Sequence, residues 1–134
     1  MQIERLFSDK TIPYVPQFAG EREKAGQDPD FSPVVFFLQP MTVAQFEAAG
    51  EILQPSGGEG PLRFQVRPEE EEEILSTHVR RIENLAYSDG TPIPDGRAFA
   101  EARHKTSGTL APLFLEILAA VRDLSILREG ERKN

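Results

Sequence analysis

Two long stretches of the chain carry apolar residues at three- and four-residue spacing, which is the pattern of a helix with one buried face. The first stretch, 69–87, opens with five glutamates and continues with the stripe Ile74, Leu75, His78, Val79, Ile82, Leu85 and Ala86. The second stretch, 109–128, carries the stripe Leu110, Leu113, Phe114, Ile117, Val121 and Leu124. The pattern therefore predicts two long helices.

The ends of the first stretch also suit a helix. Proline is tolerated at the first helical position because its missing N–H would have no partner there, and Pro68 occupies that place. The acidic side chains of 69–73 interact favourably with the positive end of the helix dipole. Gly90 can adopt the left-handed conformation that often follows a helix. We therefore expect a helix that ends just before this glycine.

Shorter apolar segments, bounded by proline and glycine, predict strands. Segment 31–39 has a continuous Val- and Phe-rich centre, which indicates a strand that is buried on both faces. Segment 11–18 holds two prolines and is expected to be at best an edge strand. Segment 62–66 alternates apolar and polar residues, and 1–7 is a further short strand.

Two shorter helices are predicted at 41–53 and 97–104. In the first, Thr42 and Gln45 have the spacing of a capping box, in which each side chain satisfies a free backbone N–H of the other. Gly50 weakens the far end of this helix.

These elements predict an α+β fold, in which a small antiparallel sheet of about three or four short strands packs against helices 69–87 and 109–128 and one or two shorter helices. A chain of 134 residues has the size of one domain, so we expect 1–134 to form a single unit. Its composition predicts flexible loops near 20–30 and 54–61 and a frayed, charged tail at 129–134.

The helix at 109–128 is apolar on more than one side, and its polar strip is narrow. A helix of this kind is usually buried on most sides. Either it is the central core helix, or one of its flanks packs on another protein or on a second copy of the chain. In the second case, the partner-binding side chains are Leu115, Leu118 and Ile126, which lie away from the centre of the stripe.

The charge of the chain bears on its partners. It carries 22 acidic and 15 basic residues, a net charge of −7. Nucleic acids and anionic membranes attract basic surfaces, so we expect neither as a partner.

The chain has no cysteine, which excludes disulfides, thiolate metal sites and cysteine nucleophiles. The first ten residues lack the apolar core of a secretory signal, and we expect a cytoplasmic location.

Few residues suggest chemistry. Consecutive helical positions point around the whole cylinder, so the glutamates of 69–73 cannot converge on one cation. His78 lies on the apolar stripe, where it is a metal ligand, an acid–base group or, most simply, a hydrogen-bonded core residue. Asp89 and Asp95 could form a carboxylate pair, but both suit turns.

A basic cluster could bind an anion or form ordinary charged surface; it comprises Arg80, Arg81, Arg97, Arg103, His104 and Lys105. The histidines, carboxylates and basic residues match no catalytic motif. The sequence therefore predicts no catalytic residue, no cofactor and no metal site.

The order of segments resembles small phage and prophage proteins of the tail-assembly-chaperone type. The resemblance lies in TIPYVPQF, FFLQPMTVAQFEAAG, VRRIENLAYSDGTPI and the closing LREGERKN. It implies a non-enzymatic protein of the host cytoplasm that coats apolar stretches of the tape-measure protein until tail-tube subunits displace it.

Two alternatives remain open. One is a structural virion component, such as a head–tail joining or tail-end ring protein. The other is a small ligand-binding domain or enzyme, which a pocket holding His78 or His104 beside a carboxylate would favour.

Overall fold

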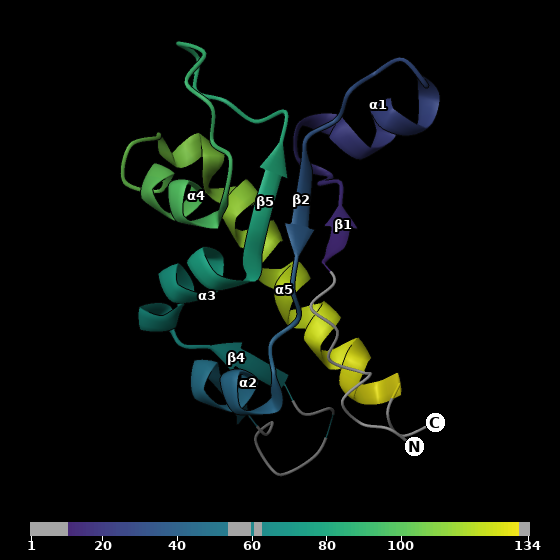
Figure 1. Ribbon diagram of the computed structural model, residues 1–134. Helices are drawn as coiled ribbons and strands as arrows, with labels where there is room; N and C mark the ends of the chain where they lie inside the picture. Colours follow the sequence, from purple (N-terminus) through teal and green to yellow (C-terminus); the bar gives the residue numbers. More distant parts are fainter. Residues whose placement is uncertain (1–10, 54–59, 61–62, 132–134) are drawn as a thin grey trace.

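The computed structural model describes residues 11–53, 60 and 63–131, with side chains described through residue 125 except at positions 52, 53 and 63. It has the predicted α+β architecture (Figure 1). The elements follow in the order β1 (Ile12–Tyr14), the 3₁₀ helix η2 (Phe18–Gly20), α1 (Glu21–Gln27), β2 (Val35–Leu38), α2 (Val43–Ala49), β3 (Gly50–Leu53), β4 (Arg63–Val66), the 3₁₀ helix η4 (Pro68–Glu70), α3 (Glu71–His78), β5 (Val79–Glu83), α4 (Gly96–Ala102), the 3₁₀ helix η5 (Gly108–Leu110) and α5 (Ala111–Glu131).

Strand β2 is the centre of an antiparallel sheet with the order β1-β2-β5. The predicted strand at 31–39 is confirmed at its apolar centre, and the proline-containing β1 is an edge strand, as expected. Phe36 and Leu38 are fully buried, whereas Val35 and Phe37 are half-buried. One face of the strand is therefore buried and the other only half-buried, so the expectation that the strand is buried on both faces is correct for one face only.

A second antiparallel sheet consists of β3 and β4. The sequence predicted one sheet and a helix through Leu53, but α2 ends at Ala49 and the chain continues as strand β3. Gly50 allows the close pairing of β3 with β4, because a Cβ there would collide with the backbone carbonyl oxygen of Gln65 and lie 2.6 Å from the side chain of Phe64. The predicted capping box of Thr42 and Gln45 is present at the start of α2.

The predicted helix at 69–87 is wrong beyond His78, where α3 passes directly into strand β5. β5 pairs Arg81 with Phe37 and Val79 with Leu38, so Arg80 is an extra residue opposite the irregularity in β2. A bulge of this kind places two residues opposite one. Val79 and Ile82 are consequently both buried at a spacing of three, which the sequence pattern cannot distinguish from a helical stripe.

After β5 the chain forms a tight hairpin over residues 85–93. Asn84 leaves the strand with a left-handed φ of 63°, and Gly90 turns the hairpin with a φ of 91°. The N–H of Tyr87 donates to the carbonyl of Thr91 over 2.8 Å. Gly90 is therefore left-handed as predicted, but it serves a hairpin turn rather than a helix end.

The segment 20–30, predicted as a loop, contains helix α1. This helix has no buried residue, so burial periodicity could not have revealed it. The predicted tail at 129–134 is also helical as far as Glu131. The predicted strand at 1–7, most of the loop at 54–61 and residues 132–134 lie outside the described residues.

The core is built around three aromatic rings. Phe99 of α4 packs edge-on against Phe36 of β2, with ring centroids 5.0 Å apart, and stacks on Phe114 of α5 at 4.4 Å. Helix α5 runs behind the three-stranded sheet (Figure 1). The predicted helix at 109–128 is thus confirmed as a core helix. None of the described helices, α5 included, combines the length and apolar composition that crossing a bilayer requires.

Candidate functional site

The three proposed partner-binding side chains of α5 have different environments. Leu115 is 61% exposed, which is unusual for a large aliphatic side chain. Leu118 is only 7% exposed and belongs to the core, so the expectation that it forms an exposed anchor is wrong. The side chain of Ile126 lies outside the described residues. The exposed flank of α5 therefore centres on Leu115.

Leu115 borders a hollow between α5 and β4, which we call the α5 groove. It encloses about 320 Å³ and is lined by Phe64, Gln65, Val66, Glu71, Leu115, Leu118, Ala119 and Arg122. Phe64 is held by stacking on Phe46 of α2, with ring centroids 3.9 Å apart. The groove therefore has a predominantly apolar lining on one side of the protein's central helix.

Charged groups of opposite sign accompany the α5 groove. The Glu71 carboxylate accepts a hydrogen bond from the guanidinium of Arg103 over 2.9 Å. Arg122 donates to the neighbouring Asp123 over 3.0 Å. The groove thus combines apolar walls with charged residues at its edge.

A larger hollow, which we call the apolar cleft, was not anticipated from the sequence. It encloses about 450 Å³ between η2, the start of β2, the 85–93 hairpin, α4 and the start of α5. Its apolar lining is Pro16, Phe18, Ala19, Val34, Leu85, Ala86, Tyr87, Ile93, Phe99, Ala102, Leu110, Leu113 and Phe114. These residues come from distant parts of the chain, and several also belong to the predicted core stripe of α5.

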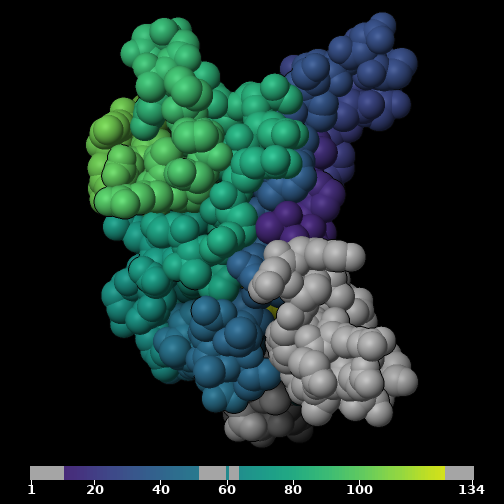
Figure 2. Space-filling model, in the orientation of Figure 1, coloured from purple at the N-terminus to yellow at the C-terminus, as the bar shows by residue number. Residues whose placement is uncertain are grey.

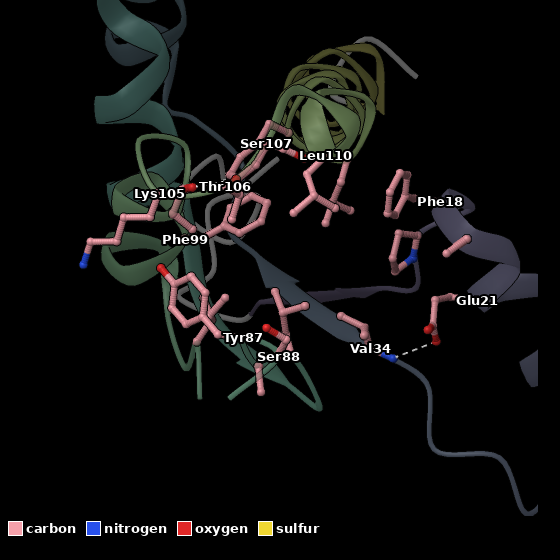
Figure 3. Close-up of a pocket in the computed structure, with 18 residues that line it drawn as sticks. Phe18, Glu21, Val34, Tyr87, Ser88, Phe99, Lys105, Thr106, Ser107 and Leu110 are labelled. Carbon is pink, nitrogen blue, oxygen red and sulfur yellow. Dashed lines mark hydrogen bonds between the residues drawn. The ribbon is translucent and has the colours of Figure 1, made fainter. Parts of the chain in front are cut away.

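Several polar groups beside the apolar cleft are already used by the protein itself. The Glu21 carboxylate accepts a hydrogen bond from the backbone N–H of Val34 over 3.2 Å (Figure 3). The Thr106 hydroxyl donates to the carbonyl of Ala102 over 2.7 Å. Lys105 extends its amino group away from the cavity (Figure 3). Among the described residues, no buried side-chain nitrogen or oxygen lacks a partner.

One wall of the apolar cleft is fixed by a carboxylate on α5. Glu116 accepts hydrogen bonds from the backbone N–H groups of Gln17 and Phe18, over 2.7 and 3.0 Å. Ala19 follows with a left-handed φ of 57°, and Gly20 has a φ of 72°. Glu116 lies on the narrow polar strip of the 109–128 helix, and in the fold it anchors the segment that leads into α1.

The two histidines have separate structural roles. His78 is buried, and its Nδ1 lies 3.0 Å from the carbonyl oxygen of Gln39. Because a carbonyl only accepts, this nitrogen carries the proton in the hydrogen bond. Burial lowers the pKa of His78 and outweighs the opposing effect of the Gln39 hydrogen bond. The interpretation as a core histidine is confirmed, and His104 instead contacts the exposed Glu72.

The acidic residues proposed for turns do serve turns. Asp95 caps α4 by accepting a hydrogen bond from the N–H of Ala98 over 2.9 Å. Asp89 accepts from the N–H of Thr91 over 2.9 Å, which lowers the pKa of Asp89. Neither histidine and neither of these aspartates lines the groove or the cleft.

The described residues include no group of three or more histidine, aspartate or glutamate side chains placed to hold a metal ion. The linings of the α5 groove and of the apolar cleft offer mainly apolar contact. A scan of protein-family models and searches of curated proteins and of solved structures found no match to the chain.

Proposed function

We propose that this protein is a non-enzymatic binding protein that holds an apolar segment of a partner protein against the α5 groove. We further propose that it acts as a chaperone in phage or prophage tail assembly. The observation that carries the binding function is Leu115, which is 61% exposed beside the groove that it lines with Phe64 and Val66. The tail-assembly setting rests on the sequence resemblance.

An exposed leucine beside an apolar hollow is suited to protein contact. Single exposed apolar residues are common on protein surfaces, but a hollow lined by apolar side chains can bury an apolar group of a partner. A stable interface buries roughly 800 Å² on each partner. The α5 groove is therefore proposed as an anchor within a larger contact area.

The charged residues around the groove support selectivity in binding. Glu71 and Arg122 have opposite charges, and a partner with complementary charges at these places would be oriented by them. The acidic net charge of −7 also keeps the unbound protein soluble while Leu115 is exposed.

Co-expression with a phage tape-measure protein from the same genome tests this function. We expect the two proteins to co-purify, and Leu115→Glu to abolish co-purification because it places a charge in the apolar contact. Ala111→Glu is the matched control, since Ala111 is exposed on the same helix but does not line the groove.

Two results would contradict the proposal. A wild-type protein that forms no complex excludes the tape-measure protein as partner, and a complex that tolerates Leu115→Glu excludes the α5 groove. Retention of the protein in purified virions would favour the structural-component alternative, because an assembly chaperone is released before the particle is complete.

A further inference from the structure

The α5 groove runs along one edge of strand β4. Side chains of a strand alternate between its two faces, so Gln65 points to the opposite face from Phe64 and Val66. All three residues nevertheless line the groove. A hollow that is lined by residues of both faces borders the edge of the strand. Strand β3 pairs with the other edge of β4, and no strand within the described ranges pairs with this one.

The register of β3 and β4 identifies the backbone groups at this edge. The N–H of Arg67 donates to the carbonyl of Ala49 over 2.9 Å, one step beyond Val66 in the same register. Hydrogen-bonded and non-hydrogen-bonded pairs alternate along an antiparallel ladder, so Gln65 is bonded to β3 and its two neighbours are not. The N–H and C=O groups of Phe64 and Val66 therefore point away from β3.

The protein blocks the edges of its other sheet. Exposed strand edges invite pairing with other chains, and folded proteins usually cover or interrupt them. At β1, Pro13 has no N–H, and Arg22 donates to the carbonyl of Val15 over 3.0 Å. At β5, the N–H of Ile82 donates to the carbonyl of Pro94 over 2.8 Å. The edge of β4 instead has a hollow beside it, which leaves room for a further strand.

The two sides of the groove differ in chemistry. Helix α2 covers one face of β4 through the stacking of Phe46 on Phe64, and Figure 2 shows α2, in blue, as the outer surface at the lower end of the protein. Across the groove, α5 contributes Leu115, Leu118 and Ala119. An occupant therefore meets backbone groups of β4 on one side and aliphatic side chains on the other.

An extended polypeptide segment matches both sides. A strand supplies N–H and C=O groups at the two-residue spacing of Phe64 and Val66, and its alternate side chains can pack on an apolar wall. A helix has bonded its own backbone groups internally. A second copy of β4 would bring β3 and α2 with it, so a groove bounded by α5 favours a single segment.

We propose that an extended segment of the partner protein adds to β4 as a third strand, with alternate apolar side chains against α5. This inference rests on the proposed function for its site and adds the conformation of the bound segment. Backbone hydrogen bonds supply affinity in this mode of recognition, and the apolar wall selects the side chains.

The first test follows amide exchange by NMR in the full chain. The probe is the uncharged, strand-forming peptide acetyl-Ser-Val-Ser-Val-Ser-Val-Ser-amide. In the free protein, exchange should be slower at Gln65 than at Phe64 and Val66, because only Gln65 is bonded to β3. Bound probe should slow exchange at Phe64 and Val66 in a saturable way. The proposal is overturned if the probe has no such effect, or if exchange at these two residues is already as slow as at Gln65 in the free monomer.

Two N-methylated versions of the probe are the matched controls. Methyl groups on the three valine nitrogens remove the donors of one edge, and methyl groups on the last three serine nitrogens remove those of the other. Only one edge can face β4 while the valines pack on α5, so one version should bind at least about tenfold more weakly than the other. Equal binding by the two versions would overturn strand addition in favour of side-chain contact alone.

Val66→Pro removes one donor from the protein. Its N–H points away from β3, a position at which a strand tolerates proline. The variant should weaken probe binding at least about tenfold. Val66→Ala shortens the same side chain but keeps the N–H, and should weaken binding much less; equal losses would overturn the backbone contact. If Val66→Pro does not fold, the N-methylated probes decide the question.

The outcomes separate this inference from the proposed function. A complex with the tape-measure protein that tolerates a folded Val66→Pro supports the binding function and overturns strand addition. Probe binding with the expected exchange pattern, but without any tape-measure complex, supports strand addition and overturns the proposed partner. If light scattering shows a dimer that protects Phe64 and Val66 without probe, the occupant is a second copy, and the partner segment is overturned.

Discussion

The hydroxyl of Tyr14 donates a hydrogen bond to the Glu116 carboxylate over 2.6 Å, although 102 positions separate the two residues in the sequence. The N–H groups of Gln17 and Phe18 donate to the same carboxylate. Burial, followed by the hydrogen bond and the charge of Glu116, raises the pKa of the Tyr14 hydroxyl. A single side chain of α5 therefore holds the segment that joins β1 to η2.

Removing this carboxylate should loosen the N-terminal segment without disrupting the central core. Glu116→Ala leaves three donors without their acceptor, and an unsatisfied, partly buried group costs about 1–3 kcal/mol. We expect a lower midpoint in urea unfolding and faster amide exchange at Gln17 and Phe18. Tyr14→Phe removes one donor and should have a smaller effect, and equal effects of the two changes would contradict the shared anchor.

Truncation of Leu118 should destabilise the protein far more than truncation of Leu115, although only three positions separate the two residues on one helix. Leu118 is buried, so Leu118→Ala should lower the free energy of unfolding by about 2–5 kcal/mol. Leu115→Ala should change it by less than about 0.5 kcal/mol, because this side chain is exposed. Urea denaturation measures both values. Similar losses at the two positions would mean that Leu115 is buried in solution.

Acid should weaken the fold through His78. Its folded-state pKa is lowered from 6.5, so in the interval between the two pKa values the unfolded chain binds more protons. The stabilisation by neutral His78 is therefore complete above about pH 6.5 and is lost as the pH falls toward the folded-state value.

Urea unfolding at a series of pH values between about 7.5 and 5 measures this loss. His78→Gln should lower stability at neutral pH but flatten its pH dependence over this interval. If His78→Gln retains the slope, the pH dependence comes from another group.

Gly96 should tolerate no side chain, because α4 begins against the junction of α3 and β5. A Cβ at Gly96 would lie 2.9 Å from the Cβ of Val79 and would also collide with the carbonyl oxygens of Leu75 and Val79. Gly96→Ala should lower the free energy of unfolding by about 1–3 kcal/mol.

The matched control is Gly108→Ala, where an added Cβ would meet nothing within 4 Å. Its thermal midpoint should equal or slightly exceed that of the wild type. If Gly96→Ala is as stable as this control, the backbone at the α3–β5 junction can shift to accommodate a Cβ, and the prediction is wrong.

The sequence predicts the elements whose burial follows a regular period. Helix α5 has one clean stripe, and β2 has an uninterrupted apolar centre between prolines, so both could be located. Helix α1 could not, because no side chain in it is buried and its composition resembles that of a charged loop. Strand β5 was missed for a different reason: the bulge at Arg80 gives its buried residues a helical spacing.

The candidate sites were harder to predict than the elements. Leu115 lies away from the centre of the α5 stripe, and this position led to the expectation that its side chain is exposed, which it is. Leu118 has a similar offset but is covered in the folded protein. The apolar cleft depends on how η2, the hairpin and α4 are arranged, and residue spacing within one segment contains no information about that arrangement.

The bonds between the ends of the described chain also bear on how the protein folds during synthesis. The N–H of Met41 donates to the hydroxyl of Ser125, and the hydroxyl of Tyr14 donates to Glu116. Segments that are synthesised early therefore gain these hydrogen bonds only after α5 has been synthesised. At about 5–20 residues per second, the ribosome needs several seconds to deliver α5 after β2 has emerged. During that interval β2 lacks its cover and is open to proteases and to other nascent chains. We therefore expect β2 to become protected only after α5 has been synthesised and has packed behind the sheet.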